Sequence, residues 1–124
     1  MNKKQRHHIE KRLLEERARV LRALRVVASE EGVPPAEASG DVSRWPTHLA
    51  DDASDTEEQE RDFIVAQRES ELFRHIDAAL RLLREDPKAF AKCERCGHAI
   101  EFERFDVIPW TRLCAPCARE EEIV

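Results

Sequence analysis

Aromatic residues and glycine are scarce in this sequence. Tyrosine is absent, aromatic residues make up 6% of the 124 residues, and there are only three glycines. Few large apolar side chains are available for a compact core, whereas a charged fraction of 38% suits long solvated helices. With no glycine-rich phosphate loop and no nucleophile paired with a base, the sequence does not predict an enzyme.

Long apolar runs are missing as well. No stretch approaches the ~20 apolar residues that cross a bilayer. Residues 1–11 are polar and basic, with no signal-like apolar segment after them. The sequence therefore predicts a cytoplasmic protein that does not bind a membrane.

The net charge of −5 hides a separation of charge along the chain. Residues 1–25 hold nine Lys or Arg against three Glu, and residues 51–62 hold seven Asp or Glu against one Arg. An acidic chain is not typical of a protein that coats nucleic acid, so no direct sequence-specific DNA binding is expected, although the basic segment could touch a phosphate locally. The simplest interpretation is solvated pairing between the two charged segments, which stabilises little per pair.

Two segments carry apolar residues at helical spacing. In residues 3–31 they recur in pairs seven apart, and a second segment that ends at Arg84 repeats at the same interval. Gly32 and the following prolines end the first helix, so that residues 32–47 form a loop and the second helix begins within 47–56. The apolar stripes consist of Ile9, Leu13, Leu14, Val20, Leu21, Leu24, Val27 and Ala28, and of Val65, Ala66, Leu72, Phe73, Ile76, Ala79, Leu80 and Leu83.

These stripes predict a mainly α fold. Each helix must bury its stripe against the other, because neither has another partner, and the result is an antiparallel helical hairpin that resembles a coiled coil. Residues 1–87 are assigned to this hairpin, with an acidic tip near 47–57. Residues 88–119 are assigned to a small finger with a C-terminal helical turn, and residues 120–124 to an acidic tail.

The four cysteines form two CxxC pairs separated by seventeen residues, namely Cys93 with Cys96 and Cys114 with Cys117. This spacing is typical of four-cysteine zinc sites, in which each pair binds one face of a tetrahedral ion. Two disulfides would need an oxidising compartment, and a redox CxxC motif would need a thioredoxin-like βαβ pattern. The sequence indicates neither of these. One zinc ion is predicted, and it is structural because four sulfur ligands close its coordination shell.

Three further features of the finger lead to predictions. Gly97 suits a tight turn whose amides point at thiolate sulfur. His98 is a competing ligand, but four cysteines suffice, so a surface or second-shell role is favoured. Residues 99–105 alternate apolar and polar side chains, which is compatible with a short strand in which Ile100 and Phe102 are partly buried.

The cysteine segments resemble the zinc finger of the DksA/TraR proteins, bacterial regulators of transcription. Upstream, residues 48–53 and 75–80 are similar to the hairpin half of many members, so the resemblance covers roughly residues 45–118. In the finger it rests on Cys93-Glu94-Arg95-Cys96-Gly97-His98-Ala99-Ile100, on Arg104 and Pro109, and on Thr111-Arg112-Leu113-Cys114-Ala115-Pro116-Cys117.

The resemblance implies a protein that binds RNA polymerase without contacting promoter DNA. Its hairpin would enter the secondary channel, so that acidic residues at the tip approach the catalytic region. Members often carry an Asp-x-x-Asp-x-Ala tip, and the ungapped alignment places Asp51 and Ala53 on its second half, with His48 in place of the first Asp. The other candidate pair, Asp52 and Asp55, requires a gap in the alignment.

Some members bind guanosine tetraphosphate at the polymerase interface with basic residues of the finger and second helix. The corresponding positions here are His75, Ile108 and Ala118, so two cations are lost and dependence on this alarmone is in doubt. Cations that remain nearby are Arg104, Arg112 and Arg119.

The predicted function is therefore that of a DksA-like regulator of transcription initiation. The alternative is a zinc-stapled helical adaptor that uses the same hairpin against some other helical protein. Co-purification with core RNA polymerase separates the two.

Overall fold

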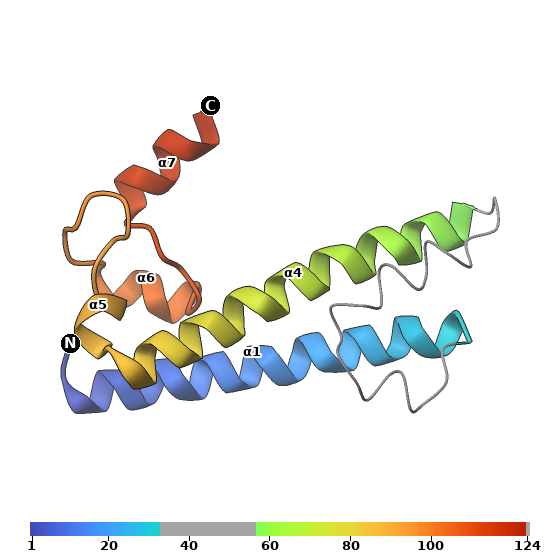
Figure 1. Ribbon diagram of the computed structural model, residues 1–124, viewed down its shortest axis with the longest axis horizontal. Coiled ribbons are helices and arrows are strands. Elements are labelled where there is room, and N and C mark those ends of the chain that lie inside the picture. The colour runs from blue at the N-terminus through green and yellow to red at the C-terminus, as the bar shows by residue number, and fades with distance from the viewer. Residues whose placement is uncertain (33–56, 124) are drawn as a thin grey trace. The chain divides into compact units, whose positions relative to one another are not determined.

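The computed structural model describes residues 1–32 and 57–123. Their helices are, in order, α1 (Lys3–Glu30), α4 (Glu57–Glu85), α5 (Pro87–Phe90), α6 (Phe102–Val107) and α7 (Ala115–Ile123) (Figure 1). Within these residues there is no strand, and only an isolated antiparallel bridge joins Lys92 to Ala99. None of the helices in the described ranges is long and apolar enough to span a membrane. The predicted mainly α fold is confirmed.

Helix α1 has well-defined signals at both ends. At its start, the Gln5 amide donates to Asn2 Oδ1 at 2.8 Å and the Asn2 amide donates to Gln5 Oε1 at 3.0 Å, a reciprocal cap that satisfies two otherwise unpaired donors. At its end, Gly32 has a φ of 73°, a left-handed conformation that glycine adopts without strain. The helix thus ends where the sequence predicts.

Helix α4 places Glu57, Glu58 and Glu60 in its first turn, where carboxylates oppose the helix dipole favourably. It ends before Asp86, whose Oδ1 accepts from the Ala89 amide at 3.2 Å and so caps the short helix α5. The predicted start of the second helix within 47–56, and the predicted loop beyond Gly32, lie outside the described residues.

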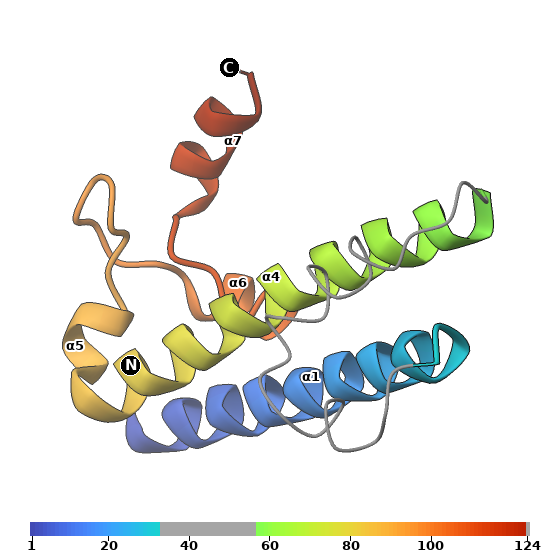
Figure 2. The same cartoon turned by 45° about the vertical axis from the view of Figure 1, so that its right-hand side comes forward.

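Helices α1 and α4 run side by side in opposite directions (Figures 1 and 2), which confirms the predicted hairpin. The chain divides into two compact units, Met1–Glu16 with His75–Val124, and Arg17–Arg74. Each unit has its own buried seam between the two helices. The seam contains Ile9, Leu13, Ile76, Ala79, Leu80 and Leu83 in the first unit, and Val20, Leu24, Val27, Ala28, Ala66 and Ser70 in the second.

The buried seam is narrower than the stripes that the sequence predicts. Leu14 is 45% exposed and Val65 is 39% exposed, so their assignment to the core was wrong. A single partner helix covers only a narrow stripe of the facing helix, so Leu14 and Val65, at the edge of the predicted stripes, stay in water.

One polar position lies inside the seam of the second unit. Ser70 is fully buried, although the apolar periodicity did not select it. Nearby, the Arg17 guanidinium lies 4.7 Å from the centre of the Phe73 ring, and Arg19 pairs with Glu69 at 3.8 Å. Polar residues at such positions favour one register of helix pairing over others.

The finger has a small aromatic core. Phe90 of α5 and Phe105 of α6 are buried and stack with ring centres 4.8 Å apart, and Ile100 is buried as well. The compatible strand over 99–105 is not formed, because Phe102–Val107 is helix α6. The i, i+3 spacing of Phe102 and Phe105 suits one helix face, and the alternation that suggested a strand does not extend past Phe102.

Leu80→Asp should unfold the helical pair. Leu80 is 5% exposed, and an unpaired carboxylate in a buried seam costs on the order of 3–5 kcal/mol. Thermal unfolding followed by circular dichroism should show a much lower midpoint. Leu14→Asp makes the same chemical change at an exposed position of the same unit and serves as the control. Equal midpoints for the two variants would contradict the seam.

The second unit also brings two carboxyl groups together. A hydrogen bond to Asp62, burial, and repulsion from Asp62, Glu58 and Glu30 raise the pKa of Glu31 above its ordinary value. The folded state therefore binds this proton more tightly than the unfolded state does. Stability from this group is present at low pH and is lost as the pH rises through the raised pKa.

Glu31→Gln should consequently raise the thermal midpoint at pH 7, because it removes the repulsion with Asp62. The gain should shrink as the pH falls toward 4, where the wild-type carboxyl carries its proton. Variant and wild type are compared at each pH by circular dichroism. Glu71→Gln, at an exposed position of the same unit, is the control. A gain that is constant with pH, or equal in the control, would refute this assignment.

Candidate metal centre

The structure brings together the four cysteines that the sequence selects. Their Sγ atoms all lie within 4.8 Å of one another, and Cys96 Sγ is 3.6 Å from Cys114 Sγ. A tetrahedral zinc ion with bonds of about 2.3 Å to sulfur requires sulfur–sulfur separations of about 3.8 Å. None of the four forms a disulfide. The geometry therefore fits one metal ion with four thiolate ligands.

The first cysteine pair lies on a tight turn. The Gly97 amide donates to the Cys93 carbonyl at 2.9 Å, and Gly97 has a φ of 78°, which a side chain would strain. The Cys93 amide donates to the His98 carbonyl at 2.8 Å and closes the turn. His98 is exposed and is not one of the residues that converge on the site, in agreement with its predicted surface role.

The second cysteine pair lies at the start of α7. Cys114 precedes the helix, Cys117 is buried in its first turn, and the Ala118 amide donates to the Cys114 carbonyl at 3.0 Å. The Glu94 amide donates to the Arg112 carbonyl at 3.0 Å. This bond directly links the two zinc knuckles, which are the turns that carry the first and the second cysteine pair. Two short backbone turns thus fix all four sulfur atoms.

The thiols differ in acidity. Burial opposes ionisation of Cys93, yet backbone amides of Cys114, Cys96 and Arg95 donate to its sulfur and lower its pKa to about 6. For Cys117, a hydrogen bond with the Cys114 thiol, together with burial, raises the pKa to about 12. Metal binding must displace protons from the more basic thiols, so zinc affinity should fall as the pH falls.

Arg112 fastens the second knuckle to α5. Its guanidinium donates to the carbonyls of Phe90 at 2.8 Å, Ala89 at 3.1 Å and Lys92 at 3.3 Å, and it lies 5.1 Å from the centre of the Phe90 ring. Burial lowers the pKa of Arg112, while Glu94 and Cys93 oppose that change. Sequence reasoning gave Arg112 as part of the finger motif and as a cation near the alarmone positions, and it missed this structural role.

Two other arginines hold the same knuckle. Arg104 Nε donates to the Leu113 carbonyl at 2.7 Å, immediately before Cys114. Arg95 donates to the Cys117 carbonyl at 3.5 Å and pairs with Glu120 at 3.4 Å. Buried carbonyl groups need donors, and in this strand-free finger arginine side chains supply them.

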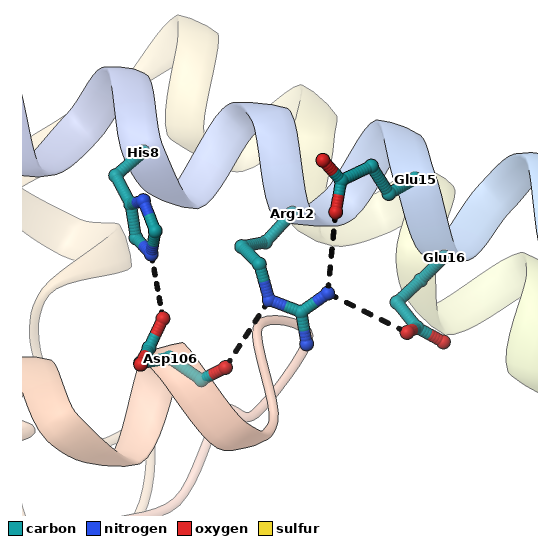
Figure 3. Close-up of polar contacts among 5 residues, drawn as sticks. All are labelled: His8, Arg12, Glu15, Glu16 and Asp106. Atoms are coloured by element: carbon teal, nitrogen blue, oxygen red, sulfur yellow. Dashed lines mark hydrogen bonds and ion pairs between the residues drawn. The ribbon is translucent and has the colours of Figure 1, made fainter.

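Helix α1 also contacts the finger (Figure 3). His8 Nε2 lies 2.5 Å from Asp106 Oδ1 in α6, and Arg12 Nε donates to the Asp106 carbonyl at 3.3 Å. The His8 ring packs against Phe102 with centres 5.7 Å apart. Arg12 is further held by Glu15 and Glu16, each at 3.6 Å. No local sequence signal could have indicated these contacts, because about 90 residues separate the partners.

The remaining predicted site residues fall into two groups. The tip candidates Asp51, Asp52, Ala53 and Asp55 lie outside the described residues. The three positions matched to alarmone binding, His75, Ile108 and Ala118, line one groove together with Arg104 and Arg112.

Cys114→Ser should abolish stoichiometric zinc binding and disorder the finger, because metal binding supplies much of the folding free energy of so small a segment. Metal content per chain and proteolysis within residues 88–119 measure the two effects. His98→Ala, next to a ligand, should keep its zinc. Less than about half an equivalent of zinc in wild-type protein, with intact thiols and no other metal, would contradict the site.

Comparison with known proteins places these observations in a family. Residues 88–122 match the prokaryotic dksA/traR C4-type zinc finger. A protein of Aquifex aeolicus (strain VF5), described only as uncharacterized, is 34% identical over 122 residues, which cover 98% of this chain and 79% of that protein. No solved structure gives a significant match. Zinc is therefore the ion that the cysteines hold, and the chain belongs to the DksA/TraR C4-type zinc finger family.

Proposed function

We propose that this protein is a DksA-like regulator that binds RNA polymerase through the secondary channel and modulates transcription initiation. The observation that supports the proposal most is the combination, in one chain, of a packed pair of long helices with a finger of the DksA/TraR type. Helix α4 has 29 residues and is about 43 Å long, enough to reach far into a channel. A pair of helices is also narrow enough to enter where a globular domain is excluded.

In this proposal binding and effect belong to different residues. The finger and the helical pair supply the contact area, whereas the tip supplies negative charge close to a magnesium-centred active site of the polymerase. Asp51 and Ala53 are the preferred tip residues, and Asp52 with Asp55 is the alternative pair. The protein acts by contact, and no catalytic role is assigned to any residue.

Guanosine tetraphosphate is not required by this proposal. Arg104 and Arg112 also line the groove formed by His75, Ile108 and Ala118, and both already donate hydrogen bonds to backbone carbonyls of the finger. Arg112 donates through both terminal nitrogens to backbone carbonyls, and Arg104 donates through Nε. These bonds occupy N–H donors that phosphate oxygens would need, and the carboxylates of Glu94 and Glu121 line the same groove, so we expect the effect on transcription to depend weakly, if at all, on the alarmone.

The decisive test of binding is co-purification of the full zinc-loaded chain with core RNA polymerase. Retention of the wild-type protein, and loss of retention in Cys114→Ser, are the expected results. A chain that keeps its zinc and its fold but is not retained by polymerase, and is retained by another helical protein, would favour the adaptor function instead.

Asp51→Asn should weaken the effect on transcription initiation without reducing the affinity for RNA polymerase. The substitution keeps the size and hydrogen-bonding capacity of the side chain and removes one negative charge, so polymerase affinity should be nearly unchanged while the effect on initiation weakens. Single-round transcription on a responsive promoter, with affinity measured in parallel by competition, provides the readout. Asp55→Asn should matter less. If Asp55→Asn weakens the effect on initiation more than Asp51→Asn does, the tip lies one turn further along the chain. If neither variant changes the effect, the acidic segment is only a solvated helix start.

A further inference from the structure

A cleft lies between the start of α1 and the segment that joins α4 to the finger. Its lining residues all belong to the first unit, and Figures 1 and 2 show the N-terminal end of α1 beside α5. The charged residues that line it are Arg6, Glu85, Asp86, Lys88 and Lys92. The cleft has a volume of about 670 Å³, which is large enough for a small organic molecule.

Three cations of this cleft have no carboxylate partner. Arg6 is half-buried, and Lys88 and Lys92 are exposed. None of the three forms an ion pair within residues 1–32 and 57–121, although two carboxylates line the same cleft. Like charges that converge repel one another, so their shared position is unfavourable unless an anion joins them. The positive charge of the cleft is therefore available to a ligand.

The backbone that carries the two lysines is held in place by other parts of the chain. Asp86 Oδ1 accepts from the Ala89 amide at 3.2 Å, and the Lys92 amide donates to the Ala89 carbonyl at 3.1 Å. Arg112 donates to the carbonyls of Ala89 at 3.1 Å and Lys92 at 3.3 Å. Lys88 and Lys92 thus extend from one fixed turn, so a ligand loses little free energy in ordering it.

The three cations match a phosphate monoester better than a carboxylate. A phosphate monoester carries a charge of about −1.5 to −2 at pH 7 and offers three acceptor oxygens. Lysine binds phosphate as a point charge, and arginine binds it through two parallel N–H donors. A carboxylate has one charge and two oxygens, which a single arginine satisfies. One phosphate group can therefore use Arg6, Lys88 and Lys92 together.

The two carboxylates of the cleft restrict the rest of the ligand. Asp86 uses Oδ1 to cap α5, whereas the Glu85 carboxylate has no hydrogen bond or ion pair within the described parts of the chain. Ionised carboxylates only accept hydrogen bonds, and they repel a bare anion. A ligand with hydroxyl groups beside its phosphate supplies the donors that Glu85 lacks.

We propose that the cleft between Arg6, Glu85, Lys88 and Lys92 binds a phosphate monoester that also carries hydroxyl groups, such as a sugar phosphate. The phosphate group contacts the three cations, and a hydroxyl group donates to Glu85. No residue of the cleft lines the groove that contains His75. The inference goes beyond the proposed function, because binding requires neither RNA polymerase nor the acidic tip.

A ligand in this cleft would join three parts of the first unit. Arg6 belongs to α1, Lys88 belongs to α5, and Lys92 precedes the first zinc ligand. A ligand that binds only the folded chain stabilises it by mass action, so the thermal midpoint should rise with ligand concentration. The concentration of the phosphate monoester would thus control how firmly α1 is held against the finger.

The test is isothermal titration calorimetry of the full zinc-loaded chain with glucose 6-phosphate at constant ionic strength. The expected dissociation constant is on the order of 1 mM or below. Two comparison probes separate the parts of the ligand. Methyl phosphate has the phosphate group without the sugar hydroxyl groups, and malate has two carboxylates and a hydroxyl group. Glucose 6-phosphate should bind at least about fivefold more tightly than either probe.

Paired variants test the residues. Lys88→Gln with Lys92→Gln removes two cations of the cleft and should weaken glucose 6-phosphate binding at least about tenfold. Lys11→Gln with Arg81→Gln removes equal charge from exposed positions that do not line the cleft and should bind like wild type. Glu85→Ala should bring the preference for glucose 6-phosphate over methyl phosphate close to one. Zinc content and the thermal midpoint without ligand verify that each variant is folded.

Three outcomes would overturn the proposal. No measurable binding of glucose 6-phosphate to wild type at about 10 mM would show that the cations of the cleft are only solvated. Equal losses in both paired variants would show that net charge, not the cleft, attracts the probe, and equal affinity for malate would exclude a preference for phosphate. Binding of the probe by a chain that RNA polymerase does not retain would support this site and contradict only the proposed function.

Discussion

Coordination of one zinc ion by four sulfur atoms is the interaction on which the C-terminal part of this protein depends. The apolar residues buried in the finger, chiefly Phe90, Ile100 and Phe105, are too few to fold such a segment alone. Metal binding supplies the missing free energy, and it also fixes the turn at residues 93–98 and the turn from which α7 starts. Since Asp106 of α6 receives His8 and Arg12, the zinc ion indirectly supports the first turns of α1 as well.

The small size of the finger also affects how its backbone carbonyls are hydrogen-bonded. A segment without strands has no ladder of backbone bonds around the cysteines, so its carbonyls depend on other donors. Arg112 donates to four carbonyls from one guanidinium, and Arg104 and Arg95 donate to one each, at Leu113 and Cys117. Arginines that sequence comparison would assign to a polyanion are thus required by the fold, which explains why positive charge in the groove does not by itself indicate a ligand.

Features with a local signal could be predicted from the sequence. Gly32 and Asp86 mark helix ends because their conformation or capping is determined by their immediate neighbours, and the cysteine spacing determines the metal site in the same way. Features that depend on distant partners could not be predicted. The narrowness of the seam depends on how much of α1 a single partner helix covers, and the His8–Asp106 contact joins residues 98 apart. Helix α6 was missed because six residues are too few for periodicity to separate a helix from a strand.

The seven-residue repeat of the seam has a consequence for how proteins of this kind can vary in length. A shorter insertion in either helix would rotate its buried stripe away from the other helix, because the stripe returns to the same side only after two turns. Reach can therefore change only by whole heptads added to α1 and α4 together, in steps of about 10 Å.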